Sequence, residues 1–81
     1  MSGSNFPKIV SVMGYSGYRL NERPLSFVLD GRELQVVNII DRWHGEDYEY
    51  FKLLADDGRV YLLKWDRLDD AWFVVRITES Q

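Results

Sequence analysis

Short apolar stretches separated by turn-forming residues run along most of the chain. Residues 25–29 and 33–41 are rich in apolar and β-branched side chains, which favours strands over helices. Asp30 and Gly31 stand between them, and this pair is typical of a two-residue hairpin turn because glycine accepts the positive φ that the turn requires. In that hairpin Phe27 faces Leu34, and the pattern therefore predicts an apolar set of cross-strand pairs.

A second hairpin is predicted by the same signal further along the chain. Residues 48–55 and 59–65 are strand-like, and Asp57 and Gly58 lie between them. A two-residue turn at this point sets the register of the two strands. The facing pairs are then Leu53 with Leu62, Ala55 with Val60, and Tyr50 with Trp65.

The remaining pattern predicts an all-β fold. Residues 71–78 read as a further strand, with Trp72 and Val74 on one face and Phe73, Val75 and Ile77 on the other. No stretch has a sustained helical period, and about five strands at short spacing indicate an antiparallel meander. Several strands are apolar on both faces, so we expect the sheet to bend round and close, or to curl over the β-leaning residues 6–13, as a small, partly open barrel of SH3-like size.

The length and composition indicate one small domain. The chain has 81 residues, of which we assign 1–5 to a disordered tail and 6–81 to a single β domain. It contains no cysteine, which excludes disulfides, thiolate catalysis and cysteine-based metal sites. No apolar run approaches the ~20 residues that a membrane-spanning helix needs, so we expect a cytoplasmic protein.

The net charge is −3, and such a balance disfavours nucleic acid as a partner. The arginines are scattered among acidic residues, and no basic run is present.

Residues 41–47, with the sequence DRWHGED, carry the chain's only histidine. As a catalytic site this stretch would use His44 as the base and Asp41, Glu46 or Asp47 as its orienting partner, but it holds no serine, threonine or cysteine as a nucleophile. One histidine is also too few for the usual zinc sites. We therefore predict a bend in which Gly45 turns the chain and Trp43 packs back as an anchor, with no enzyme activity, metal or cofactor.

The aromatic residues, 15% of the chain, are more numerous than so small a core requires. Exposed rings beside arginine are common in binding surfaces, so we predict a non-catalytic module that docks a protein partner or a second copy of itself. The predicted surface consists of Tyr15, Tyr18, Arg19, Arg23, Arg42, Trp43 and Tyr48.

The alternative is a surface that associates with nucleic acid. In the register predicted above, Tyr50, Lys52 and Trp65 fall on one face of the sheet, where rings can stack on bases and lysines can neutralise phosphates. The residues of this alternative face are Tyr50, Lys52, Lys64 and Trp65, with Arg42 and Trp43 beside them.

Several short motifs together resemble a family of short, uncharacterised bacterial cytoplasmic proteins. The matching residues are 15–18, 22–24, 41–43, 50–52, 57–58 and 61–63, so the resemblance spans about Tyr15 to Trp72. Related small domains occur near translesion-polymerase-like proteins. The resemblance implies an all-β domain of bacterial origin and a connection to DNA repair, and it implies no particular activity.

Overall fold

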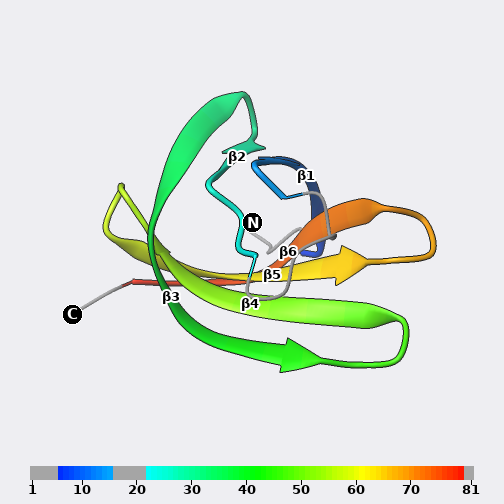
Figure 1. The fold of residues 1–81 in the computed structure, drawn as a ribbon. Coiled ribbons are helices and arrows are strands. Elements are labelled where there is room, and N and C mark those ends of the chain that lie inside the picture. Colours follow the sequence, from blue (N-terminus) through cyan, green and yellow to red (C-terminus); the bar gives the residue numbers. More distant parts are fainter. Residues whose placement is uncertain (1–5, 16–21, 80–81) are drawn as a thin grey trace.

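The computed structural model describes residues 6–15 and 22–79, so the predicted tail at residues 1–5 lies outside the described residues. Every regular element among them is a β-strand (Figure 1). The strands are β1 (Lys8–Met13), β2 (Ser26–Leu29), β3 (Arg32–His44), β4 (Tyr48–Ala55), β5 (Arg59–Asp66) and β6 (Ala71–Glu79). In this part of the chain no helix is long and apolar enough to cross a membrane. The predicted all-β fold is confirmed.

The six strands form a closed antiparallel barrel in which each strand pairs with the next. β1 closes it, because its first half pairs with β6, with Val10 opposite Trp72, and its second half pairs with β2, with Val12 opposite Phe27. The long, curved β3 pairs first with β2 and then with β4 (Figure 1). A small, partly open barrel was predicted, and the structure closes it, because the N-terminal segment supplies a sixth strand and Val10 is buried in the interior.

The hairpin between β2 and β3 is the one that the sequence predicts. Leu29 pairs with Arg32 and Phe27 pairs with Leu34, which leaves a two-residue turn. Asp30 and Gly31 have φ values of +53° and +81°, as a type I′ turn requires.

The hairpin between β4 and β5 has a different register from the predicted one. Phe51 pairs with Leu63 and Tyr50 pairs with Lys64, a shift of one residue along β5. The connection contains three residues, 56–58, and its third residue, Gly58, has a φ of +84° and donates its N–H to the carbonyl oxygen of Ala55. A shift of one residue moves every side chain of β5 to the other face of the sheet. Trp65 therefore faces the barrel interior, opposite Glu49.

The interior is filled by apolar side chains from all six strands. The buried set is Val10, Phe27, Leu29, Leu34, Phe51, Leu53, Ala55, Tyr61, Leu63, Trp72 and Val74.

Strand β6 contains a β-bulge at Val75. Its pairing with β5 shifts between Leu62, which faces Arg76, and Leu63, which faces Val74, so Val75 is an extra residue. Ile77 was predicted to share the outer face with Phe73. Because of the bulge, it pairs with Tyr61 and packs against the core instead.

The buried Tyr61 makes the stability of the barrel sensitive to alkaline pH. Burial, together with the hydrogen bond to the Asp57 carboxylate, raises the pKa of the Tyr61 hydroxyl to about 12. An unfolded tyrosine titrates near ~10, so between these two values the unfolded chain loses a proton that the folded chain keeps. We therefore expect the free energy of unfolding to be independent of Tyr61 ionisation below pH ~10 and to fall as the pH rises from there.

This expectation is checked by urea denaturation at a series of pH values from 8 to 12. Tyr61→Phe removes the titrating group, so its stability should fall less steeply with pH than that of the wild type. Equal slopes for the two proteins would contradict the assignment.

Candidate functional site

Residues 41–47 contribute to two different surfaces, because successive strand residues point to opposite faces. Arg42 pairs with Phe51 and His44 with Glu49, on the face that continues the barrel interior. Trp43 pairs with Tyr50 on the outer face. The predicted docking surface is therefore divided at this point.

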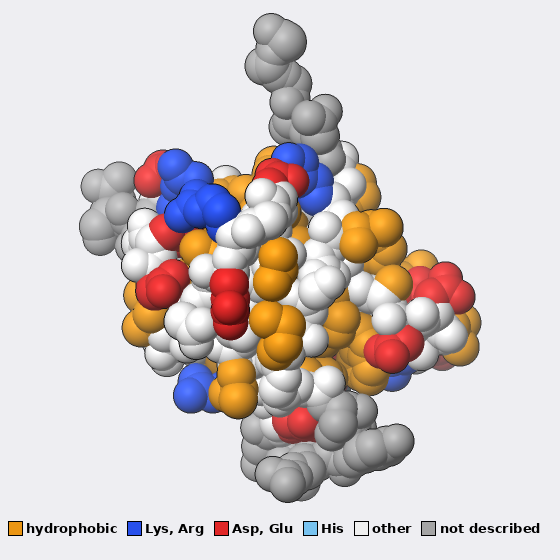
Figure 2. Space-filling view, turned by 90° about the horizontal axis from the view of Figure 1, so that it is seen from above, with side chains coloured by type: hydrophobic (Ala, Val, Ile, Leu, Met, Phe, Trp, Pro, Cys, Tyr) orange, Lys and Arg blue, Asp and Glu red, His pale blue; other side chains and the backbone are white. Residues whose placement is uncertain are grey.

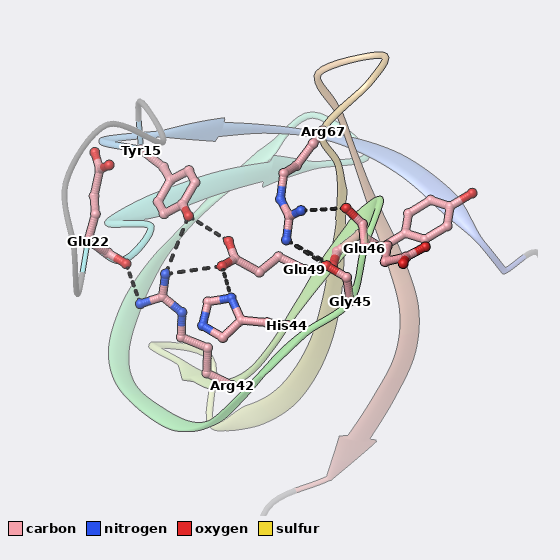
Figure 3. A network of polar contacts seen from close by, with 9 residues as sticks. Tyr15, Glu22, Arg42, His44, Gly45, Glu46, Glu49 and Arg67 are labelled. Atoms are coloured by element: carbon pink, nitrogen blue, oxygen red, sulfur yellow. Dashed lines mark hydrogen bonds and ion pairs between the residues drawn. The ribbon is translucent and has the colours of Figure 1, made fainter.

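Glu49 is the centre of a polar network at one end of the barrel interior (Figure 3). The Glu49 side chain is buried, and its Oε1 accepts a hydrogen bond of 2.6 Å from the Tyr15 hydroxyl. Its Oε2 lies 2.5 Å from Nδ1 of His44 and 3.4 Å from Nη2 of Arg42. The carboxylate that contacts His44 is thus Glu49, and not Asp41, Glu46 or Asp47 as the sequence predicted.

The network links segments that lie far apart in the sequence. Nη1 of Arg42 donates to the backbone carbonyl of Glu22 over 2.8 Å, and the Arg42 guanidinium lies 4.8 Å from the centre of the Phe51 ring. The Tyr15 ring makes edge contacts with Phe51, Trp65 and Trp72. Burial, followed by the hydrogen bond to Glu49, raises the pKa of the Tyr15 hydroxyl well above its ordinary value. Tyr15 and Arg42 are therefore engaged within the fold, which corrects their prediction as partner-contacting residues.

Sequence reasoning did not single out Glu49, although a signal for it exists. Strand β4 reads YEYFKLLA, and Glu49 shares its face with Phe51, Leu53 and Ala55, all of which are buried. A charged residue in register with an apolar face is rare unless it has a polar partner inside the protein. The alternation therefore marks Glu49 as a paired interior carboxylate.

The chain bends after β3, as predicted, and backbone contacts hold the bend, whereas Trp43 lies outside it. The N–H of Gly45 donates to the carbonyl oxygen of Tyr48 over 2.7 Å. The guanidinium of Arg67 donates to the carbonyl oxygens of Glu46 and Gly45 over 2.7 and 2.8 Å, which ties this turn to the one between β5 and β6 (Figure 3). Trp43 lies within β3 and is 44% exposed, so its prediction as the anchor of the turn is wrong.

The outer side of β3–β6 brings together residues that the sequence assigned to two alternative surfaces. A row across these four strands contains Trp43, Tyr50, Lys64 and Phe73, each paired with the next. The next row contains Asp41, Lys52, Leu62 and Arg76, each paired with the next. We call this surface the Trp43 face and define it by Ile40, Trp43, Tyr48, Tyr50, Lys52, Leu62, Lys64 and Arg76. Trp65, predicted to lie beside Tyr50 and Lys52, is on the opposite side of the sheet.

A hollow of about 460 Å³ crosses the Trp43 face. Its lining residues are Ile40, Trp43, Lys52, Val60, Leu62, Arg76, Thr78 and Glu79. Ile40 and Trp43 are both about half exposed at this hollow.

The cations of the Trp43 face form no ion pair within the part of the chain that the structure describes. Within residues 6–15 and 22–79, neither Lys52 nor Arg76 forms an ion pair or side-chain hydrogen bond, and the Lys64 ammonium lies 4.0 Å from the centre of the Tyr48 ring. The hollow therefore combines exposed apolar surface with positive charge that the fold does not use.

The other predicted residues lie apart from this face or outside the described chain. Arg23 is exposed in the segment before β2, and Tyr18 and Arg19 lie outside the described residues. Figure 2, which views the molecule from the side of the β2–β3 hairpin, shows basic side chains in small groups beside acidic ones, with no continuous basic surface on that face. Among the described residues no group of three or more histidine, aspartate or glutamate side chains could hold a metal ion.

Comparisons with known proteins find no relative: no family model, no curated protein and no solved structure matches this chain. The resemblance to short bacterial proteins stays a prediction.

Proposed function

We propose that this chain is a small, non-catalytic, cytoplasmic binding module that docks a protein partner on the Trp43 face. One observation carries the proposal: a half-exposed Trp43 borders a hollow whose cations, Lys52 and Arg76, form no ion pair within the described chain. Tryptophan and arginine are the residues that most often dominate the binding energy of protein interfaces.

The charge of the hollow defines the chemistry of the partner segment. Lys52, Lys64 and Arg76 lie on one face and form no ion pair within the described chain, whereas Glu79, the acidic residue that lines the hollow, pairs with Arg59 over 2.9 Å. Opposite charge across an interface fixes orientation and register. The partner segment is therefore acidic, with apolar side chains that fill the hollow beside Ile40 and Trp43.

The polar network around Glu49 supports the non-catalytic part of the proposal. Glu49 receives contacts from Tyr15, Arg42 and His44, and these contacts join the segment before β2 to strands β3 and β4. A buried carboxylate with several donors from different elements fits a role in holding the end of the barrel together.

Selection from a library of random peptides displayed on phage tests this proposal. Peptides that bind the wild-type chain should be rich in acidic residues, and Trp43→Ala should weaken their binding at least tenfold, because loss of a central tryptophan removes a large part of the binding energy. Leu68→Ala is the matched control, since Leu68 is exposed but belongs to the β5–β6 turn and not to the Trp43 face. Peptides that bind Trp43→Ala as well as the wild type, or a failure to select any peptide, would overturn the proposal.

Single-stranded nucleic acid is the second candidate, and the row of Trp43, Tyr50 and Lys64 on one face favours it. Rings can stack on bases and lysines can neutralise phosphates, as the predicted link to DNA repair would require. A 15-nucleotide oligodeoxythymidine should then bind at low salt and lose affinity steeply as salt is added. Such binding, in the absence of selected peptides, would replace the first proposal with this one.

A further inference from the structure

Within residues 6–15 and 22–79, the second half of β6 has a free edge. β1 pairs with β6 only from Trp72 to Val74, whereas β5 pairs with β6 on its other side as far as Glu79. Within the described chain, residues 75–79 therefore have no strand beside them on the side away from β5. The bulge at Val75 coincides with the end of the pairing to β1, and bulges commonly end pairing in this way.

This free edge borders the hollow of the Trp43 face. Arg76, which pairs with Leu62, and Thr78, which pairs with Val60, both line the hollow from β6. A strand added along residues 75–79 would place alternate side chains next to those of Arg76 and Thr78, because facing residues of neighbouring strands share a face. The added strand would thus form a further wall of the hollow.

The charges of the edge decide which strand fits. Glu79 pairs with Arg59, whereas Arg76 forms no ion pair within the described chain and is available to an added strand. Two copies of β6 can pair about a two-fold axis. If the axis is centred on Arg76, the two Arg76 side chains lie opposite each other, and if it is centred on Ile77, they lie diagonal to each other. Like charges so placed are destabilising. A strand with an acidic residue at that position gains an ion pair instead. The edge is therefore better suited to an acidic segment of another protein than to a second copy of this chain.

We propose that the partner segment binds as an extended strand added to the edge of β6 at residues 75–79, with an acidic side chain beside Arg76. This proposal rests on the proposed function and names its binding mode. Main-chain hydrogen bonds to the edge provide affinity in such complexes, and pockets for alternate side chains provide specificity. Here the hollow supplies the pocket, and Arg76 supplies the charge that sets the register.

N-methylation of a peptide selected by the wild-type chain tests the binding mode. In an added strand every second N–H points to β6, so methylation of one alternate set of residues should weaken binding at least tenfold, while methylation of the other set should change it little. Suppose that a selected peptide still depends on Trp43 and yet loses affinity equally on methylation at successive positions, or loses none. Either result would overturn strand addition and leave the proposed function intact. If no peptide depends on Trp43, both proposals fail.

A charge reversal tests the role of Arg76. Arg76→Glu should weaken the acidic peptide at least tenfold, and a peptide with lysine at the acidic position should recover affinity for this variant. Arg32→Glu is the matched control, because Arg32 is also exposed but lies at the start of β3, outside the hollow. Equal losses of peptide affinity in the two variants would contradict the assignment. It would also be contradicted if sedimentation equilibrium shows a dimer of this chain that the peptide does not dissociate.

Discussion

Replacing Trp72 with alanine is expected to lower the free energy of unfolding by about 3–5 kcal/mol. The Trp72 side chain is 7% exposed, and its ring lies 5.3 Å from that of Tyr15, 5.6 Å from that of Phe51 and 5.8 Å from that of Trp65. Truncation therefore leaves a large cavity and removes three ring contacts at once. A domain of 81 residues has a total stability of about 4–12 kcal/mol, so this one truncation should remove at least about a quarter of it.

Urea denaturation followed by far-UV circular dichroism measures this loss, and Trp43→Ala provides the contrast. Trp43 lies on the outer face, so its truncation should cost only about 1 kcal/mol while it abolishes peptide binding. Similar losses of stability in the two variants would show that Trp43 supports the core and would remove the argument for the Trp43 face.

Replacing Glu49 with alanine is the second change with a large expected effect, a loss of about 3 kcal/mol. Without the carboxylate, the Tyr15 hydroxyl loses its hydrogen-bond acceptor, and the Arg42 guanidinium loses its opposite charge. Removal of one member of a buried pair is costly because the other member stays desolvated. The His44 and Arg42 side chains are partly exposed, at 64% and 23%, so water compensates in part, and the expected loss lies at the lower end for buried pairs.

The double variant Glu49→Ala with Tyr15→Phe separates this network from simple packing. Since Tyr15→Phe removes the hydroxyl that Glu49→Ala leaves unpaired, the two losses should sum to more than the loss in the double variant. Strict additivity, measured by urea denaturation at pH 7, would mean that the hydrogen bond between Tyr15 and Glu49 contributes nothing to stability.

The two hairpins show how far local sequence could predict register. Both carry Asp-Gly, and the signal placed both turns correctly along the chain, but only the first has the predicted two-residue loop. In the predicted register of the second hairpin, Lys64 would face the fully buried Phe51, whereas the observed register places Leu63 there. The cost of burying a lysine beside an apolar ring outweighs the preference for the shorter loop.

The candidate site was predicted in its components but not in its arrangement. Trp43, Tyr48 and Lys64 were all named from the sequence, and they lie on one face. Arg42 and Tyr15 were assigned to the same surface, but strand alternation turns Arg42 inward, and Tyr15 reaches the Glu49 carboxylate from 34 residues away. Contacts over such a sequence separation leave no local signal.

The sequence by itself determined that this protein is all-β, where its strands lie and where its chain reverses, because strand period and turn chemistry are properties of neighbouring residues. Only the tertiary structure decided that β1 joins β6 to close the barrel, that Glu49 is paired inside it, and that the hollow of the Trp43 face lies beside a free edge of β6. These features depend on which distant segments meet, and that choice is made by the burial of apolar surface and the pairing of polar groups across the whole barrel.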